Sequence, residues 1–243
     1  LYFPVQRKFG RHFTVFVSGG APLAPDLFRF WNSMGFIVLE GYGLTETSPV
    51  LCVNTMERQQ AGSVGPPLPG VRLKLAAKEV LVQGDNVFPG YYENEQATRD
   101  AFTADGWFRT GDLGELDPDG WLIIKGREKE LIVTGSGVNV YPDDLETVLN
   151  RIGGVKESCV VGLNRGGGEE VHAVLLLDGS GVKPEEIISQ ANKNLDTLHQ
   201  ITGYSIWQEP EFPKTTTLKI RKFAVKEELE RGSHADAATT SND

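Results

Sequence analysis

The order strand, helix, strand near the start of the chain constrains its fold more than any other feature. Residues 13–17 form a short apolar run that ends in a glycine turn, and residues 36–39 form a second run of this kind. Between them, residues 25–34 carry apolar side chains at near-helical spacing. Two strands joined in this way are typical of a parallel α/β sheet. We therefore predict that residues 1–56 are the end of a parallel α/β subdomain.

The pattern changes twice further along the chain. Residues 57–127 are rich in glycine and proline and contain short alternating runs, which predicts a small β-barrel-like subdomain built from hairpins. Residues 128–230 mix strand-like runs with two helices, which begin near Pro142 and Pro184 because proline and the acids after it suit a first helical turn. This part is predicted to be an α+β domain. Residues 231–243 are small and polar, so we expect a disordered tail.

Composition excludes several classes of protein. The chain has 243 residues, 40% hydrophobic and 23% charged, with a net charge of −9, which argues against nucleic-acid binding. Cys52 and Cys159 are too few for a disulfide scaffold, so we expect a cytoplasmic protein. No apolar run approaches the roughly 18–20 residues that span a membrane. The chain begins with Leu1 and without a clear start, which suggests that it begins within a domain.

Two neighbouring segments, Gly106–Gly114 and Gly126–Glu130, contain candidate ligand-binding groups. Asp112 lies between glycines, where a turn would let its carboxylate accept hydrogen bonds from a ribose diol. The alternative is an Asp that bonds its own backbone, which is the commoner role beside glycine. Arg127 and Lys129 follow a strand-like run, and each could equally be a solvated charge.

The turn Gly41–Glu46 follows the second predicted strand, at an edge where open α/β sheets bind ligands. Tyr42 offers a flat face for a base, Thr45 a hydroxyl, and Glu46 a hard oxygen for Mg²⁺. The alternative is a glycine turn with Thr45 as a helix cap. Lys219 lies in a basic cluster, which is either an exposed charged face or a source of positive charge for phosphoryl chemistry.

Taken in order, these segments resemble the adenylate-forming superfamily of acyl-CoA synthetases, adenylation domains and luciferases. The resemblance covers the chain up to about residue 230, and eight motifs in the family's order make it specific. The matching segments are Ser18–Leu23, Gly41–Glu46, Gly62–Pro67, Gly90–Tyr92, Gly106–Gly114, Gly126–Glu130, Gly137–Pro142 and the Lys219 segment.

The resemblance implies a nucleotide site in the first half of the chain. Gly20 and Ala21, with the turn Gly41-Tyr42-Gly43, would border the adenine of ATP. Asp112 and Arg127 would hold the ribose hydroxyls.

The resemblance also implies how the remaining residues act. Thr45 would contact phosphate, and Glu46 would bind Mg²⁺. Lys129 would be the hinge of a mobile C-terminal domain, whose Lys219 reaches the site for adenylation. The loop Gly135-Ser136-Gly137 would face the channel for coenzyme A. A carboxylate would attack the α-phosphate of ATP, and a thiol would then displace AMP from the acyl-adenylate.

The segment from Leu131 to Pro142 is most similar to bacterial long-chain fatty acid–CoA ligases, which implies fatty acid and coenzyme A as substrates. Two departures stand out. Leu218 replaces the glycine usual before the adenylation lysine. The phosphate-binding loop expected upstream of Ser18 is absent, so the chain by itself is predicted to be inactive.

Two alternatives remain at this stage. An acyl carrier protein could replace coenzyme A as acceptor, which would leave the first reaction unchanged. The chain could instead be a non-catalytic nucleotide- or CoA-binding module, because the phosphate loop is missing. Peripheral contact with the inner surface of the membrane is a further open expectation for a protein acting on fatty acids, although no basic amphipathic helix requires it.

Overall fold

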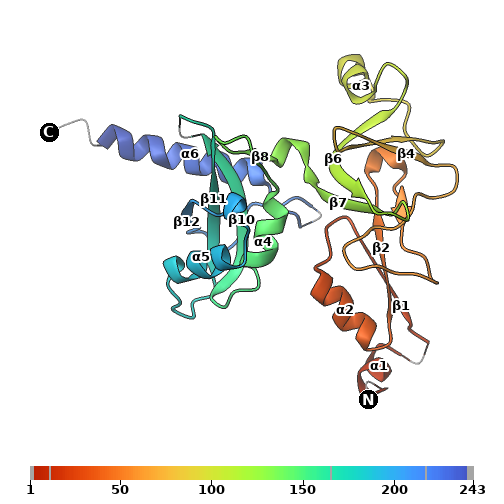
Figure 1. Cartoon of the computed structure of the whole chain (residues 1–243), viewed down its shortest axis with the longest axis horizontal. Coiled ribbons are helices and arrows are strands. Elements are labelled where there is room, and N and C mark those ends of the chain that lie inside the picture. Colours follow the sequence, from red (N-terminus) through yellow and green to blue (C-terminus); the bar gives the residue numbers. More distant parts are fainter. Residues whose placement is uncertain (1–2, 11, 165, 217, 240–243) are drawn as a thin grey trace. The chain divides into compact units, whose positions relative to one another are not determined.

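The computed structural model describes residues 3–10, 12–164, 166–216 and 218–239, which form two compact units, Leu1–Glu128 and Lys129–Asp243 (Figure 1). The boundary lies one residue beyond the one expected from the sequence, and residues 1–56 and 57–127 belong to the same unit. Along the described ranges, no helix is both long and apolar enough to cross a membrane.

In its described residues, the first unit contains two sheets and three α-helices. Its elements are α1 (Phe3–Phe9), β1 (Val15–Gly19), α2 (Pro25–Ser33), β2 (Ile37–Tyr42), the 3₁₀ turn η1 (Thr45–Thr47), β3 (Cys52–Val53), β4 (Arg72–Ala76), β5 (Glu79–Gln83), α3 (Glu95–Ala101), β6 (Phe108–Leu116) and β7 (Leu122–Arg127).

The predicted order strand, helix, strand is present at the start of this unit. Strands β1 and β2 pair in parallel, β3 pairs antiparallel with β2, and α2 packs beside β2 (Figure 1). Helix α2 begins at Pro25, whose fixed φ suits the first turn, and Phe28 is its buried residue. The pairing places the ends of β1 and β2 side by side, and the loops that follow them carry the first candidate site residues.

The predicted β-barrel-like subdomain is instead an open sheet. Its four strands follow the order β4-β5-β6-β7 with antiparallel neighbours, and β4 does not pair with β7 in the described structure. The alternating apolar pattern correctly predicted the strands. Whether a sheet closes into a barrel depends on the stagger between its strands, which this pattern does not specify. The core of this part packs around Leu51, Val80, Val82, Phe108 and Leu122.

The second unit is an α+β domain. Its elements are the 3₁₀ turn η2 (Glu128–Glu130), which spans the boundary, β8 (Ile132–Val133), β9 (Asn139–Val140), α4 (Pro142–Leu149), β10 (Val155–Asn164), β11 (Glu169–Leu177), α5 (Pro184–Lys193), the 3₁₀ turn η3 (Thr197–His199), β12 (Gly203–Ile206) and α6 (Lys222–Thr239).

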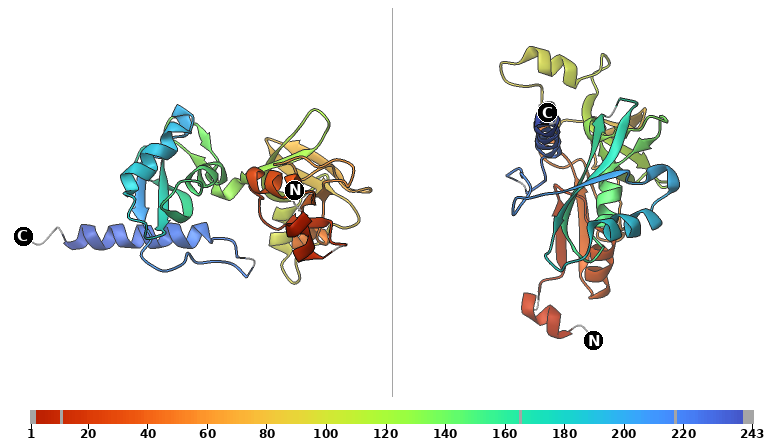
Figure 2. Two further views of the ribbon diagram at one scale, coloured as in Figure 1. Left: turned by 90° about the horizontal axis from the view of Figure 1, so that it is seen from below. Right: turned by 90° about the vertical axis from the view of Figure 1, so that its left-hand side faces the viewer.

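Helices cover both faces of the sheet β10-β11-β12. Helices α4 and α5 pack on one face, where Leu145, Leu149 and Ile187 are buried against it, and α6 lies on the opposite face (Figures 1 and 2). Val225 of α6 is fully buried there, beside Cys159 of β10. Because both faces are covered, β10 and β11 consist of nearly continuous buried residues and lack the alternation of a half-exposed strand.

Helices α1, α3 and α6 were not predicted. Helix α3 begins after Asn94, whose side chain accepts a hydrogen bond from Ala97 N–H at 3.0 Å, so a capping signal was present. Helix α6 continues to Thr239, through most of the segment expected to be a disordered tail. That segment contains several alanines, and alanine has the highest helix propensity. Residues 240–243 lie outside the described residues.

Both cysteines are buried and unpaired. Cys52 of β3 and Cys159 of β10 each have 0% of their surface exposed. Burial raises the pKa of the Cys52 thiol to about 12 and also raises the pKa of Cys159. Both thiols are therefore uncharged near neutral pH and unreactive as nucleophiles.

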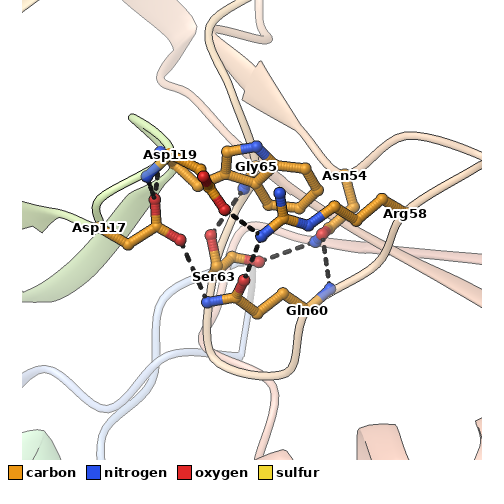
Figure 3. Close-up of polar contacts among 8 residues, drawn as sticks. Asn54, Arg58, Gln60, Ser63, Gly65, Asp117 and Asp119 are labelled. Atoms are coloured by element: carbon orange, nitrogen blue, oxygen red, sulfur yellow. Dashed lines mark hydrogen bonds and ion pairs between the residues drawn. The ribbon is translucent and has the colours of Figure 1, made fainter.

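A polar network ties the loop 55–63 to the turn before β7 (Figure 3). Arg58 Nη2 lies 2.7 Å from Asp119 Oδ2, and its guanidinium carbon lies 4.4 Å from the centre of the Trp121 ring. Asn54 Nδ2 donates to the Ser63 carbonyl at 2.7 Å and to the Glu40 carbonyl of β2 at 3.3 Å. The network therefore anchors the loop beside Glu40.

The side chain of Glu40 is enclosed in this region. Glu40 is only 5% exposed, and its Oε1 atom has no hydrogen-bond partner in the described structure. Burial, partly offset by a hydrogen bond from the Gly62 backbone, raises the pKa of this carboxyl from 4.5 to about 7. A buried, poorly solvated carboxylate destabilises the folded chain wherever it must be ionised.

We expect Glu40→Gln to make the chain more stable at alkaline pH. Because the folded state binds the Glu40 proton more tightly, the contribution of this carboxyl to stability is greatest below the unfolded pKa of 4.5 and is lost as the pH rises to about 7. The variant lacks this loss, so its stability relative to wild type should improve by about 2–3 kcal/mol between about pH 5 and about pH 8. Urea unfolding followed by circular dichroism measures this difference.

The control is Glu57→Gln, which removes an exposed carboxyl from the adjacent loop. It should show no comparable change with pH. Parallel curves for Glu40→Gln and wild type would contradict the expectation.

Candidate nucleotide site

The ends of the parallel strands bring two predicted segments together. Gly19 at the end of β1 is the register partner of Gly41 in β2, so the loop containing Gly20 and Ala21 starts beside the turn at Gly43. A Cβ atom at Gly43 would lie 2.0 Å from the carbonyl oxygen of Pro49. Glycine is therefore required here by close backbone packing.

Tyr42, Asp112 and Arg127 converge at the end of β2. The Tyr42 hydroxyl donates to Asp112 Oδ2 at 2.6 Å, and Arg127 Nε lies 3.0 Å from Asp112 Oδ1. Asp112 and Arg127 are direct register partners in β6 and β7. Burial, followed by the nearby Asp112 carboxylate, raises the pKa of Tyr42 above its usual range. The phenol therefore remains protonated and acts as a donor.

The predicted Gly-bounded turn around Asp112 is wrong, because Asp112 lies inside strand β6. Arg109 and Leu113 are four positions apart, whereas their partners in β5, Leu81 and Glu79, are only two positions apart. The additional residues form a bulge, and Gly111 adopts φ 68 within it. Such bulges bend a strand and redirect its side chains.

Further contacts hold this bulge. Thr110 Oγ1 donates to the Val80 carbonyl at 2.8 Å and accepts from Asp112 N–H at 3.1 Å. Two donors from outside the bulge, Tyr42 of β2 and Arg127 of β7, contact the Asp112 carboxylate. Asp112 is only 4% exposed. This position can present carboxylate and guanidinium groups to a vicinal diol.

The segment after Gly43 forms the short turn η1. Thr45 is exposed and begins the turn, but the cap is formed by Thr47, whose Oγ1 accepts from Leu44 N–H at 2.9 Å. The alternative role for Thr45 as a helix cap is therefore wrong. Glu46 is half-buried, and its carboxylate accepts a hydrogen bond from the Tyr91 hydroxyl at 3.0 Å.

The segment 86–91 supports η1 from one side, which the sequence analysis missed. Asn86 Nδ2 donates to the Thr47 and Val50 carbonyls, at 3.0 Å each. Phe88 N–H donates to the Glu46 carbonyl at 2.8 Å. The only sequence signal was the family-like run Gly90–Tyr92, which carried no assigned role.

The residues present fit a magnesium ion shared with a phosphate ligand. Across the described ranges, no cluster of three or more His, Cys, Asp or Glu side chains could hold a metal by itself. Mg²⁺ is usually held by one or two carboxylates together with substrate phosphates. Glu46 supplies one such carboxylate, and within the described structure it forms no ion pair with a lysine or arginine.

The loop predicted for coenzyme A forms the turn between β8 and β9 in the second unit. Gly137 N–H donates to the Thr134 carbonyl at 2.8 Å, and Thr134 Oγ1 lies 3.0 Å from Ser136 Oγ. A Cβ atom at Gly135 would lie 2.2 Å from the Gly167 carbonyl oxygen. Packing against the neighbouring loop thus requires this glycine. Its role toward coenzyme A stays a prediction.

Lys129 and Lys219 are both exposed residues of the second unit. Lys129 is its first residue, which is where a hinge was predicted. Lys219 lies in a narrow loop closed by a bridge between Lys214 and Ile220. Leu218 adopts φ 63 in this loop. A left-handed conformation costs a residue with a Cβ atom about 1–2 kcal/mol, so Leu218 occupies a position that would suit glycine better.

Lys222 lies three residues after Lys219 and begins α6. Its ammonium is 2.6 Å from Asp143 Oδ1, 2.9 Å from Glu146 Oε1 and 3.7 Å from Glu130 Oε2. Burial, partly offset by Lys222, raises the pKa of Glu146 to about 7. The carboxylates, Glu146 first, outweigh burial and raise the pKa of Lys222. This cluster joins α6 to α4 and η2.

Comparison with known proteins gives the family. Residues 3–92 match the model of the AMP-binding enzyme family. The chain is 46% identical over 163 residues to the long-chain-fatty-acid–CoA ligase FadD15 of Mycobacterium bovis, covering 67% of this chain and 27% of that protein. It is 33% identical over 240 residues to the long-chain-fatty-acid–CoA ligase of Yersinia pestis, covering 91% of this chain and 41% of that protein. The chain thus spans less than half of each relative.

Solved structures support the same family. The O-succinylbenzoate coenzyme A synthetase of Bacillus subtilis, in complex with ATP and magnesium ion, superposes with a TM-score of 0.80 at 26% identity. The match covers 93% of this chain and 54% of that structure. The chain is thus part of the adenylate-forming superfamily of AMP-binding enzymes, within which it resembles the long-chain fatty acid–CoA ligases.

Proposed function

We propose that this chain supplies the ribose clamp, the metal carboxylate and the mobile domain of an AMP-forming ligase that converts a long-chain fatty acid to its coenzyme A thioester. The activity belongs to a protein with the whole length of the relatives, of which this chain corresponds to 27–41% in the two described. ATP, Mg²⁺ and coenzyme A are the implied ligands, and the phosphate-binding loop is expected elsewhere in that protein.

One observation carries the proposal most directly. Asp112 and Arg127 are partners in the consecutive strands β6 and β7, and Tyr42, 70 positions before Asp112, joins them at the end of a parallel strand pair. Ligands of open α/β sheets bind at this edge. The Asp112 carboxylate can accept from the ribose hydroxyls while Arg127 donates to them. Tyr42 limits the positions that the carboxylate can adopt.

The proposed chemistry has two steps. In the first, an oxygen of the fatty acid carboxylate attacks the α-phosphorus of ATP and pyrophosphate leaves, which yields the acyl-adenylate. Lys219 offsets the negative charge that gathers in this transition state. In the second, the thiol of coenzyme A loses its proton and attacks the acyl carbon, and AMP leaves. A bound Mg²⁺ would supply charge neutralisation at the phosphates, with Glu46 as its protein ligand.

Pyrophosphate release by the whole protein tests this proposal. With ATP, Mg²⁺, a long-chain fatty acid and coenzyme A, we expect release of pyrophosphate and AMP and formation of a thioester. Omitting the fatty acid is the control, and an acyl carrier protein in place of coenzyme A tests the other acceptor. The absence of fatty-acid-dependent pyrophosphate release would reject the proposal, and a thioester on the carrier protein alone would change the acceptor.

A further inference from the structure

The Glu46 carboxylate and its own main chain are held by one short segment of the first unit. Phe88 N–H donates to the Glu46 carbonyl at 2.8 Å, and the Tyr91 hydroxyl donates to Glu46 Oε1 at 3.0 Å. A glutamate side chain has several rotatable bonds, so a fixed backbone alone does not orient its carboxylate. Among the described contacts, the Tyr91 hydroxyl is the one that holds the carboxylate, through its Oε1 atom.

Tyr91 is itself held in place from two sides. Its N–H donates to Thr98 Oγ1 at 2.9 Å, and the Thr98 hydroxyl in turn donates to the Asn94 carbonyl at 2.9 Å. Its ring packs edge-on against Phe88, with the ring centres 4.8 Å apart. The start of α3 and the core beneath Phe88 therefore fix the position of the hydroxyl.

The exposure of Tyr91 argues against a purely structural role. The residue is 40% exposed, so its hydroxyl could bond water and does not need Glu46 as a partner. At a ligand-binding edge, a hydroxyl that donates a hydrogen bond to a carboxylate can orient that carboxylate as a metal ligand without binding the metal itself. Such groups hold ligating carboxylates in one orientation, and their loss typically weakens metal binding.

We propose that Tyr91 is a positioning residue, whose hydroxyl orients Glu46 toward the metal ion that accompanies ATP. The proposal rests on the proposed function only for the identity of the ligand, a divalent cation bound with a nucleoside triphosphate. The neighbouring Tyr92 provides a matched comparison, because it is 90% exposed and removal of its hydroxyl is an identical chemical change.

Metal binding by the whole protein is the test. Mn²⁺ replaces Mg²⁺ as a spectroscopic probe, and its binding in the presence of a non-hydrolysable ATP analogue is measured by electron paramagnetic resonance. For Tyr91→Phe we expect Mn²⁺ affinity to fall by about tenfold or more. Tyr92→Phe should bind Mn²⁺ as wild type does, and Glu46→Gln should bind it more weakly than Tyr91→Phe.

A kinetic measurement separates positioning from folding. In the ligase reaction, Tyr91→Phe should raise the Mg²⁺ concentration needed for half-maximal rate by a similar factor, and saturating Mg²⁺ should restore most of kcat. Its thermal midpoint should match that of Tyr92→Phe. The proposal is overturned if Tyr91→Phe and Tyr92→Phe bind Mn²⁺ equally, or if Glu46→Gln leaves Mn²⁺ affinity unchanged. Failure of the proposed function would appear separately, as wild-type protein without fatty-acid-dependent pyrophosphate release.

Discussion

Replacement of Lys222 by methionine is expected to lower the free energy of unfolding of the second unit by about 3–5 kcal/mol. The ammonium lies within 3.0 Å of both Asp143 and Glu146, and its side chain is only 12% exposed. Methionine keeps the length of the side chain but leaves buried carboxylates without their counter-charge. Glu146 is the most affected, because its carboxyl is already buried enough to have a raised pKa.

The loss should depend on pH in a defined direction. Without Lys222, the folded pKa of Glu146 rises further above its unfolded value of 4.5, so the folded state gains stability when this carboxyl is protonated. The destabilisation should therefore be largest near pH 8 and smaller near pH 6. Urea unfolding at both pH values measures it, and adding Glu146→Gln to Lys222→Met should recover part of the loss.

Lys226→Met is the matched control on the same helix. Lys226 lies one turn after Lys222, its side chain is 30% exposed, and it pairs with Glu169 at 3.2 Å. A more solvated pair of this kind contributes about 1 kcal/mol or less. If the two substitutions destabilised the unit equally, the Lys222 cluster would not have the structural role inferred from its burial.

Lys219→Ala should slow formation of the acyl-adenylate by about 100-fold or more in the whole ligase, because one preorganised charge-stabilising group is lost from the transition state. The second step should respond differently. When purified acyl-adenylate and coenzyme A are supplied, thioester formation should remain close to the wild-type rate. Rapid-quench measurement of pyrophosphate and of thioester separates the two steps.

The control for this experiment is Lys214→Ala, which removes a lysine from the same loop. Lys214 Nζ pairs with Glu157 at 3.0 Å, so its charge already has a local partner. We expect this variant to retain most of its adenylation rate. Equal losses in both steps for Lys219→Ala, or equal effects of the two substitutions, would contradict the assigned role.

Local sequence patterns predicted the elements whose stability depends on neighbours along the chain. Helices α2, α4 and α5 all begin with proline and contain early acids, and these signals are independent of tertiary structure. The order of β1, α2 and β2 followed from apolar runs and glycine turns in the same way. Helix α6 escaped prediction because its polar residues and weak periodicity hid an alanine-rich segment.

Features of the site that depend on pairing across the sheet could not be predicted. The sequence around Gly111 is typical of a turn, and only the pairing with β5 shows that these residues form a bulge within a strand. The contact between Glu46 and Tyr91 joins residues 45 positions apart, and no local pattern encodes it. The resemblance supplied residue types at the site, whereas the hydrogen bonds that orient them came from the fold.

The two buried cysteines have a practical consequence for thiol assays that include this chain. A coloured disulfide reagent such as Ellman's reagent reacts with thiolates, and neither Cys52 nor Cys159 provides an accessible one. The folded chain should therefore contribute almost no signal, whereas the free thiol of coenzyme A reacts at once. Less colour in samples withdrawn during turnover by the whole ligase would then report consumption of coenzyme A, and a delayed rise in colour from this chain alone would report its unfolding.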